Sequence, residues 1–361
     1  MKRLGIIGGG QLGLMMIVES RCLPVHFNVL VVNRDEPACK VADSVYLVDD
    51  YKAFVDNSDI VTFEFEHVDA RALEYASSQN KLRPNMKSIS LKRQRTLEKQ
   101  FFTENGLPTG KFIICKDRES LKGAIKSFES GVIKESTGGY DGKGQYYYSG
   151  NKVPEITAPG PFVVEEFVRY DYEASIISCR TENGEFFSFK PSYNENFKGM
   201  LLSNKGPINL EQARIIARKL LDSIDYIGVL GLEFFVVNGQ LLINEFAPRV
   251  HNSGNHTLMG NSISQFELHV RAVLGFSISE PISYANTGIV NIIGKILNSG
   301  EVERILQIPE TRLYIYGKTE TRKRRKMGHV CISSDSKDIL SRRIDEVKGI
   351  IYHGERENPL L

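Results

Sequence analysis

Two acidic residues, Glu233 and Glu245, interrupt two neighbouring apolar runs of the sequence. Asn238-Gly239 separates the runs, and this dipeptide is a strong signal for a tight β-hairpin. A carboxylate within a buried strand is costly unless a cation or hydrogen bonds compensate it. Two such carboxylates on paired strands, with Asn244 beside them, offer the oxygen ligands that suit Mg²⁺ bridging to nucleotide phosphates. The alternative is a hairpin whose acids face solvent.

A glycine-rich stretch, residues 138–145, follows a short predicted strand that ends at Lys134. Its four glycines among eight residues could bring backbone N–H groups close to phosphate oxygens, and Lys134 and Lys143 add positive charge. No Ser or Thr follows Lys143 and no long helix begins there, so the stretch differs from the P-loop of NTPases. We expect it to bind nucleotide phosphates; a plain flexible hairpin is the alternative.

Three glycines near the N-terminus, Gly8, Gly10 and Gly13, match the spacing G-x-G-x-x-G between a predicted strand and a predicted helix. This context favours an anion held at a helix N-terminus. A dinucleotide site also requires an acid at the end of the second strand, where this chain has Asn33. The pattern therefore predicts a phosphate site rather than a nicotinamide dinucleotide site. The alternative is a turn needed only for packing.

Further candidate residues lie at the ends of predicted strands. The strand at 60–65 carries Glu64, which could face the same crevice as the glycines, because ligands gather at the carboxyl ends of strands in open α/β sheets. Glu66 follows it and is expected to be solvated. The strand at 162–168 contains two acids that could hydrogen-bond a purine amine and ribose hydroxyls.

Polar and basic segments complete the candidate site. His251 and Asn252 come shortly after the second acidic run, which favours a place near a bound small molecule. The basic segment 318–326 is expected to be mostly an exposed loop, with one or two side chains that bind a phosphomonoester. A basic helix predicted at 91–102 is expected to direct most of its charges to solvent.

The predicted elements hold these residues in an α/β fold. Strands alternate with helices up to about residue 88, as in a parallel sheet, and a β-rich unit with a helix near 117–129 occupies 109–190. The segment 190–208 reads as a loop, and amphipathic periodicity predicts a helix at 211–224. Later predicted elements are a helix at 262–274 and strands at 287–293, 312–316 and 328–333.

Composition narrows the class of protein. The 361 residues include 46 Lys and Arg against 44 Asp and Glu, and the net charge of +2 gives no reason to expect nucleic-acid binding. No apolar run is long enough to cross a membrane, and the N-terminus lacks the pattern of a signal peptide. Five scattered cysteines without a CxxC pair fit reduced thiols. We therefore expect a cytoplasmic protein with no nucleic-acid or membrane partner.

Taken together, these segments resemble N5-carboxyaminoimidazole ribonucleotide synthetase, an ATP-grasp ligase family of purine synthesis. The most specific matches are NEFAPRVHNSG at 244–254 and RKMGH at 325–329, and the resemblance runs in order over almost the whole chain. It also includes 8–13, 62–66 and 139–145. The resemblance implies a homodimer of a three-domain chain. The implied parts are a Rossmann-like domain at 1–88, an ATP-grasp domain at 89–278 and a small β-rich domain at 279–361.

The resemblance also implies residue roles. The implied catalytic residues are Tyr140, Asp141 and Lys143, and Asp141 is our candidate for accepting a proton from the substrate amine. Glu233 and Glu245 would hold Mg²⁺, as one or two ions. The implied ATP-binding residues are Arg95, Lys134, Gly139, Tyr140, Asp141, Gly142, Lys143, Gly144, Gln145, Glu165, Glu166, Phe167, Val168, Glu173, Asn244 and Glu245. The implied ribonucleotide-binding residues are Gly10, Gln11, Leu12, Glu64, His251, Asn252, Lys318 and Arg325.

The implied reaction joins bicarbonate to the exocyclic amine of 5-aminoimidazole ribonucleotide, through carboxyphosphate, while ATP is converted to ADP and phosphate. Two segments depart from the family pattern. Phe197-Lys198 follows Glu195-Asn196 where the family usually has a histidine, and Asn255-His256 stands where the family has His-Trp. Three other hypotheses stay open: another ATP-grasp ligase such as a formate-dependent ribonucleotide transformylase, a dinucleotide oxidoreductase, and a non-catalytic nucleotide-binding protein.

Overall fold

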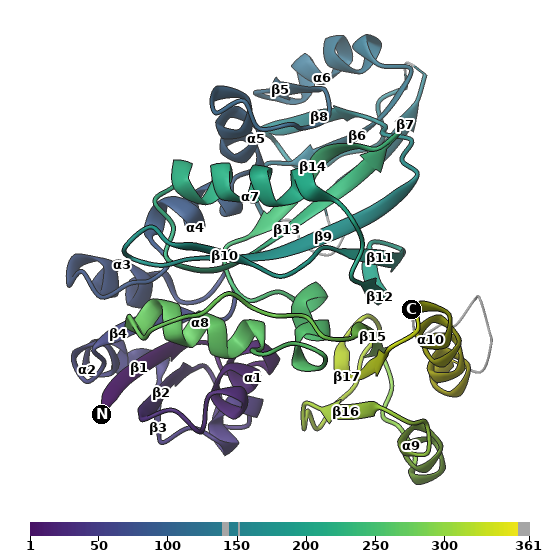
Figure 1. Ribbon diagram of the computed structural model, residues 1–361. Helices are drawn as coiled ribbons and strands as arrows, with labels where there is room; N and C mark the ends of the chain where they lie inside the picture. Colours follow the sequence, from purple (N-terminus) through teal and green to yellow (C-terminus); the bar gives the residue numbers. More distant parts are fainter. Residues whose placement is uncertain (139–143, 151, 353–361) are drawn as a thin grey trace.

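The computed structural model describes residues 1–138, 144–150 and 152–352. Within these ranges the strands form three sheets, and helices pack against them (Figure 1). The chain is therefore a mixed α/β protein, as predicted. In the same ranges no helix combines the length and the apolar character needed to cross a lipid bilayer.

The N-terminal sheet is parallel and has the strand order β3-β2-β1-β4. Its central strands are almost continuously apolar because both faces are buried. The N-terminal glycines connect β1 to α1, which gives the predicted Rossmann-like arrangement. The elements are β1 (Lys2–Ile7), α1 (Gln11–Glu19), β2 (Val25–Val31), η1 (Pro37–Lys40), β3 (Ser44–Leu47), η2 (Val48–Asp50), α2 (Tyr51–Asp56), β4 (Ile60–Phe63) and α3 (Ala70–Ser78).

Two helices lead from this sheet to a small antiparallel sheet of order β5-β8-β6-β7, at the top of Figure 1. The prediction of a single helix at 91–102 is wrong. The chain breaks at Gln94, whose extended φ of −130° and ψ of 100° separate α4 from α5. The elements are α4 (Met86–Arg93), α5 (Arg95–Glu104), β5 (Phe112–Cys115), α6 (Arg118–Ala124), η3 (Ile125–Ser127), β6 (Ser130–Glu135), β7 (Gln145–Ser149) and β8 (Phe162–Glu166).

The largest sheet runs in the order β14-β13-β9-β11-β12-β15-β17-β16, and β10 pairs with β9. The segment 190–208, predicted as a loop, instead forms β11 and β12. Some of its polar side chains find partners across the sheet, as in the 3.0 Å contact between the Ser175 and Ser192 hydroxyls. The elements up to α8 are β9 (Tyr172–Arg180), β10 (Phe186–Ser188), β11 (Ser192–Phe197), β12 (Met200–Gly206), α7 (Glu211–Ser223), β13 (Gly228–Val237), β14 (Gln240–Ala247), η4 (Asn252–Leu258) and α8 (Gln265–Leu274).

The C-terminal region continues this sheet, because β15 (Asn286–Ile293) pairs with β12. The predicted strands β16 (Thr311–Ile315) and β17 (Lys326–Ser334) are confirmed. Two helices that the sequence patterns did not predict pack beside them. They are α9 (Ser299–Leu306) and α10 (Lys337–Tyr352), and α10 buries Leu340, Ile344, Val347 and Ile351 at the spacing of one helix face.

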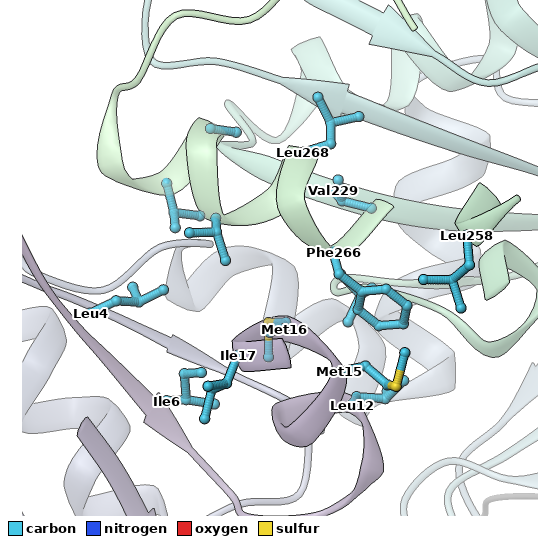
Figure 2. Packing of buried hydrophobic residues seen from close by; sticks show 14 of the residues in the cluster. Leu4, Ile6, Leu12, Met15, Met16, Ile17, Val229, Leu258, Phe266 and Leu268 are labelled. Atoms are coloured by element: carbon cyan, nitrogen blue, oxygen red, sulfur yellow. The ribbon is translucent and has the colours of Figure 1, made fainter. Parts of the chain in front are cut away.

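Helix α8 joins the N-terminal sheet to the largest sheet. Figure 2 shows Phe266 of α8 pointing towards Met15 and Leu12 of α1, with Leu268 of the same helix near Val229 of β13. These side chains belong to one buried cluster. The cluster therefore fixes the N-terminal glycine turn relative to the acid-bearing hairpin.

Candidate functional site

The acid-bearing hairpin of β13 and β14 forms as predicted. Asn238 and Gly239 have positive φ angles of 48° and 78°, as a type I′ turn requires. Glu233 pairs with Glu245 in the ladder, and opposed Cβ atoms in such pairs lie about 5 Å apart. Burial, and then the neighbouring Glu245, raise the pKa of Glu233. The Glu245 side chain is half-exposed. A cation between the two carboxylates would offset their repulsion.

The donor set of this hairpin fits Mg²⁺. In the part of the chain that the structure describes, no three or more His, Cys, Asp and Glu side chains gather so that they could hold a metal ion. Mg²⁺ is usually held by one or two carboxylates together with phosphate oxygens and water, rather than by an all-protein cage. Glu233 and Glu245 therefore suit a metal that arrives with a nucleotide.

Two lysines of the predicted basic helix are ion-paired at this site. Lys92 Nζ lies 2.6 Å from Glu245 Oε2, and attraction to this ammonium group lowers the pKa of Glu245. Lys99 Nζ lies 3.2 Å from Glu165 Oε2. Their side chains are only 18% and 3% exposed. Both lysines are exceptions to the expectation that most charges of this helix face solvent, because periodicity within a helix does not reveal which face another element covers.

Lys134 and Glu165 lie on the adjacent strands β6 and β8 and form a second part of the site. Lys134 Nζ lies 2.8 Å from Glu165 Oε1. Burial opposes ionisation of Glu165, but Lys134 and Lys99 outweigh it and lower the pKa of the carboxyl group to about 2. Two ammonium groups around one carboxylate leave positive charge where β6 leads into the glycine-rich stretch. That charge suits nucleotide phosphates.

Glu173, a predicted nucleotide contact, is held on β9 by two neighbours. The Tyr170 hydroxyl donates to one carboxylate oxygen at 2.9 Å, and the Asn196 amide donates to the other at 2.6 Å. Asn196 directly precedes Phe197, where the chain departs from the family pattern. The structure therefore puts this departure beside Glu173.

The other predicted nucleotide residues lie around the end of β8. Glu166 pairs with the exposed Lys111 at 3.2 Å. Phe167 is 44% exposed and packs edge-on against Tyr147, which leaves apolar ring surface open near Val168. Arg95 donates to the carbonyl oxygen of Glu135, at the end of β6, at 2.7 Å. On β14, Asn244 lies beside Glu245.

The predicted catalytic residues Tyr140, Asp141 and Lys143, with Gly139 and Gly142, lie outside the described residues. The flanks of this segment are described. The N–H of Glu135 donates to the carbonyl oxygen of Gly144 at 2.9 Å, and Gln145 pairs with Lys134 in the β6-β7 ladder. The glycine-rich stretch therefore connects two antiparallel strands, next to Lys134.

The N-terminal glycine turn binds a carboxylate of the chain itself. The N–H groups of Gly10 and Gly13 donate to the two oxygens of Glu64 at 2.5 and 2.9 Å. The expectation that Glu64 faces the glycines is confirmed. The expectation of a phosphate on these N–H groups is corrected, because a carboxyl group of the chain accepts their hydrogen bonds, and spacing alone could not reveal it. Burial raises the pKa of Glu64, although the hydrogen bond from Gly13 opposes the rise. Leu12 is buried in the core, so its side chain is not available to a ligand.

The C-terminal basic segment reaches this same turn. Lys318 Nζ lies 2.8 Å from Gln11 Oε1 and donates to the carbonyl oxygen of Lys326 at 2.7 Å. Burial, and then the nearby Arg325, lower the pKa of Lys318 to about 8. Arg325 donates to the carbonyl oxygen of Glu320 at 2.8 Å. The structure thus brings together Gln11 and Lys318, two predicted ribonucleotide contacts that are 307 positions apart in the chain.

Glu66 is a buried ion-pair partner, and the expectation that it is solvated is wrong. Its Oε1 atom lies 3.1 Å from Arg249 Nε, and the residue is 2% exposed. Arg93 donates to the carbonyl oxygen of Glu66 at 2.6 Å. These contacts tie the end of the N-terminal sheet to the segment that follows β14. The covering segment lies far along the sequence, so no local signal could have predicted the burial.

His251 lies next to the acid-bearing hairpin, as expected. Its Nδ1 atom is 2.9 Å from Ser253 Oγ and 3.7 Å from Glu233 Oε1. Burial lowers the pKa of His251 to about 3, so the ring is neutral near pH 7. The Nδ2 atom of Asn252 is buried without a hydrogen-bond partner among the described residues. Both side chains of the second departure, Asn255-His256, are buried.

A lysine-bearing antiparallel sheet beside an acid-bearing hairpin is the arrangement of the ATP-grasp class. Models of three domain families match the chain. The ATP-grasp domain matches residues 100–266, the ribonucleotide synthetase preATP-grasp domain matches 1–93, and the phosphoribosylaminoimidazole carboxylase C-terminal domain matches 287–343. The chain belongs to the N5-carboxyaminoimidazole ribonucleotide synthase family, as its relatives demonstrate.

Two relatives and one solved structure illustrate this similarity. The N5-carboxyaminoimidazole ribonucleotide synthase of Saccharolobus solfataricus is 46% identical over 356 residues, which cover 97% of this chain and 96% of the relative. The corresponding protein of Aquifex aeolicus is 38% identical over 365 residues, covering 99% of each. The ADP complex of an N5-carboxyaminoimidazole ribonucleotide synthetase superposes with a TM-score of 0.89 at 31% identity and covers 98% of each chain.

Proposed function

We propose that this chain carboxylates the exocyclic amine of 5-aminoimidazole ribonucleotide with bicarbonate, while ATP is converted to ADP and phosphate. The supporting observation is the facing pair of Glu233 and Glu245, close enough to Lys134 for attraction between Lys134 and Glu245. Family membership supports the choice of substrates. In this proposal residues 89–278 bind ATP, and 1–88 with 279–361 bind the ribonucleotide.

The proposed chemistry starts from bicarbonate, which is a poor electrophile at neutral pH. Transfer of the ATP γ-phosphoryl group gives carboxyphosphate, which can release CO₂ beside the amine. Lys134, with Lys99 behind it on Glu165, offsets negative charge at the phosphates, so positioning and electrostatics provide most of the rate enhancement. Mg²⁺ bound to Glu233 and Glu245 would supply further charge neutralisation.

The ribonucleotide is proposed to bind between the N-terminal glycine turn and the acid-bearing hairpin. Lys318 offers a cation for the phosphomonoester, and Gln11 holds this ammonium group in place. His251 is neutral and so provides a hydrogen bond rather than a charge. Asp141 is proposed to accept the amine proton, and the glycine-rich stretch is proposed to exclude water from the intermediate.

One assay tests this function. ADP release is measured with ATP, bicarbonate and 5-aminoimidazole ribonucleotide together, and then with each omitted in turn. Turnover that requires all three is the expected result. ADP release that proceeds without the ribonucleotide, or that needs formate in place of bicarbonate, would identify a different ATP-grasp ligase.

We also propose that the chain is a homodimer, because the family resemblance implies it, and that it is cytoplasmic, because its scattered cysteines fit reduced thiols. Light scattering at micromolar concentration should give twice the mass of one chain. A mass equal to one chain over the whole concentration range would contradict the dimer and leave the catalytic proposal untouched.

A further inference from the structure

Lys92 lies between two carboxylates of different elements. Its Nζ atom is 2.6 Å from Glu245 Oε2 on β14 and 3.7 Å from Glu98 Oε1 on α5. The Lys92 side chain is 18% exposed and that of Glu98 only 4%. The nearer contact is a hydrogen-bonded ion pair, whereas the farther one is a charge–charge contact beyond hydrogen-bond distance.

Glu98 lacks the hydrogen bond that Lys92 donates to Glu245. Its Oε1 atom is buried and has no hydrogen-bond partner among the described residues. Burial of this oxygen without a partner is costly for the ionised group and raises the pKa of Glu98, although Lys92 and then Lys99 oppose the rise. A shift of about 1 Å in the Lys92 ammonium group would shorten its contact with Glu98 to an ordinary charge-assisted hydrogen bond. The Lys92 Nζ atom also lies 6.0 Å from the ring centre of Phe246, a fully buried side chain that gives the lysine a fixed support.

We propose that Lys92 is an internal counter-cation that competes with a divalent metal ion for Glu245, and that Glu98 receives the ammonium group when the metal binds. This inference rests on the metal site of the proposed function. A divalent ion and an ammonium group on one carboxylate repel each other. Transfer of Lys92 to Glu98 removes that repulsion and gives the Glu98 oxygen its missing partner.

The exchange gives the site a preference for metal that arrives with phosphates. A free divalent ion has to displace Lys92 with only Glu233 and Glu245 to bind it. An ion carried by a nucleotide brings phosphate ligands with it, so it displaces the lysine more easily. Lys92 on α4 and Glu98 on α5 therefore act as positioning residues that link these two helices to the metal hairpin.

The first test titrates the full chain with Mn²⁺ alone and follows the electron paramagnetic resonance signal of the free ion. Lys92→Met should bind Mn²⁺ about fivefold or more tightly than wild type, the lower range of an ordinary coupling between two binding events. Lys92→Arg, which keeps the cation, should stay close to wild type. Lys87→Met is the matched control, because Lys87 is on the same helix but donates to the carbonyl oxygen of Ser223. Equal or weaker Mn²⁺ binding by Lys92→Met, including none in either protein, would overturn the proposal.

The second test is a double-mutant cycle with Glu98→Gln. Without the Glu98 charge the displaced ammonium group has no second partner, so Mn²⁺ affinity should fall in the wild-type background. The same change should have little effect in Lys92→Met. If Glu98→Gln lowers Mn²⁺ affinity equally in wild type and in Lys92→Met, the effect is a general electrostatic one. That result would overturn the proposed transfer of Lys92 to Glu98. Circular dichroism of each variant checks that it is folded, and Lys92→Gln replaces Lys92→Met if that variant does not fold.

The two proposals fail in different ways. A wild-type chain that binds Mn²⁺ but does not consume 5-aminoimidazole ribonucleotide rejects the proposed function alone. A chain that turns over normally, while Lys92→Met binds Mn²⁺ as wild type does, rejects the role of Lys92 alone.

Discussion

The Nε2 atom of His269 lies 2.9 Å from the Oγ1 atom of Thr62, and its Nδ1 atom accepts a 3.0 Å hydrogen bond from the N–H of Val229. A backbone N–H can only donate, so Nδ1 carries no proton and the Nε2–H group donates to Thr62. One buried neutral ring on α8 thus connects β4 of the N-terminal sheet to β13, the strand that carries Glu233.

We expect the protein to lose stability as the pH falls below about 6.5, the ordinary pKa of histidine. Burial lowers the pKa of His269 to about 3 and that of His256 to about 4. The unfolded chain therefore binds more protons than the folded chain in this window. The stabilising effect of the neutral rings is complete above the unfolded pKa and decreases towards acid, by about 1.4 kcal/mol per pH unit for each such histidine. Urea unfolding between about pH 7.5 and about pH 5 measures it, and His269→Phe should reduce the slope by the contribution of one histidine, about 1.4 kcal/mol per pH unit.

Replacing Glu233 with Gln should separate stability from activity. Glu233→Gln removes the repulsion from Glu245, so the melting temperature should stay equal or rise. Carboxylation should fall by about 100-fold or more, since a catalytic metal supplies several kcal/mol of charge stabilisation. The exposed Glu303→Gln is the control and should change neither quantity. Wild-type turnover in Glu233→Gln would remove Glu233 from the metal site.

Replacing Glu165 with Gln should destabilise the fold and weaken ATP binding together. It leaves the ammonium groups of Lys99 and Lys134 without their shared carboxylate. Breaking a buried ion pair in this way costs about 3–5 kcal/mol, which urea unfolding can measure, and the KM for ATP should rise. Glu182→Gln breaks the exposed pair with Arg83 and should cost about 1 kcal/mol or less. Similar losses in the two variants would contradict the special position of Glu165.

The KM for the ribonucleotide should rise as the pH passes about 8. Burial and Arg325 lower the pKa of Lys318 to about 8, so its ammonium group loses a proton there and attraction to a phosphomonoester is lost. Steady-state kinetics between about pH 7 and about pH 9 measure this trend. Lys318→Arg keeps its charge at every such pH and should remove the rise. A rise that persists unchanged in Lys318→Arg would assign the titration to another group.

Local sequence signals predicted the parts of the site that depend on local geometry. The Asn238-Gly239 turn and the apolar runs around it were sufficient to place Glu233 opposite Glu245. The glycine spacing near the N-terminus correctly placed a strand–turn–helix unit there. The short strand predicted to end at Lys134 is also present, as β6. The positions of Asp141 and its neighbours stay predictions.

The incorrect predictions concern polar groups that are buried by elements distant in the sequence. Glu66 and most charges of the helix at 91–102 were expected to be solvated, but Glu66, Lys92 and Lys99 each pair with an element that is distant in the sequence. The segment 190–208 reads as a loop because it is polar. In the structure its side chains form hydrogen bonds to neighbouring strands, as Asn196 does to Glu173. Burial of polar groups is set by tertiary partners, which periodicity and composition do not contain.

The ladder between β12 and β15 limits how this chain can be recombined. It pairs Ser203–Gly206 with Thr287–Val290, so the hydrogen bonds of one sheet cross from the central region to the C-terminal region. Truncation near residue 280 would leave the backbone of β12 open, and an open strand edge recruits other chains. Chimeras that exchange the C-terminal region between relatives would therefore have to preserve the pairing of β12 with β15. Chimeras that break this pairing would precipitate instead of folding with an altered ribonucleotide preference.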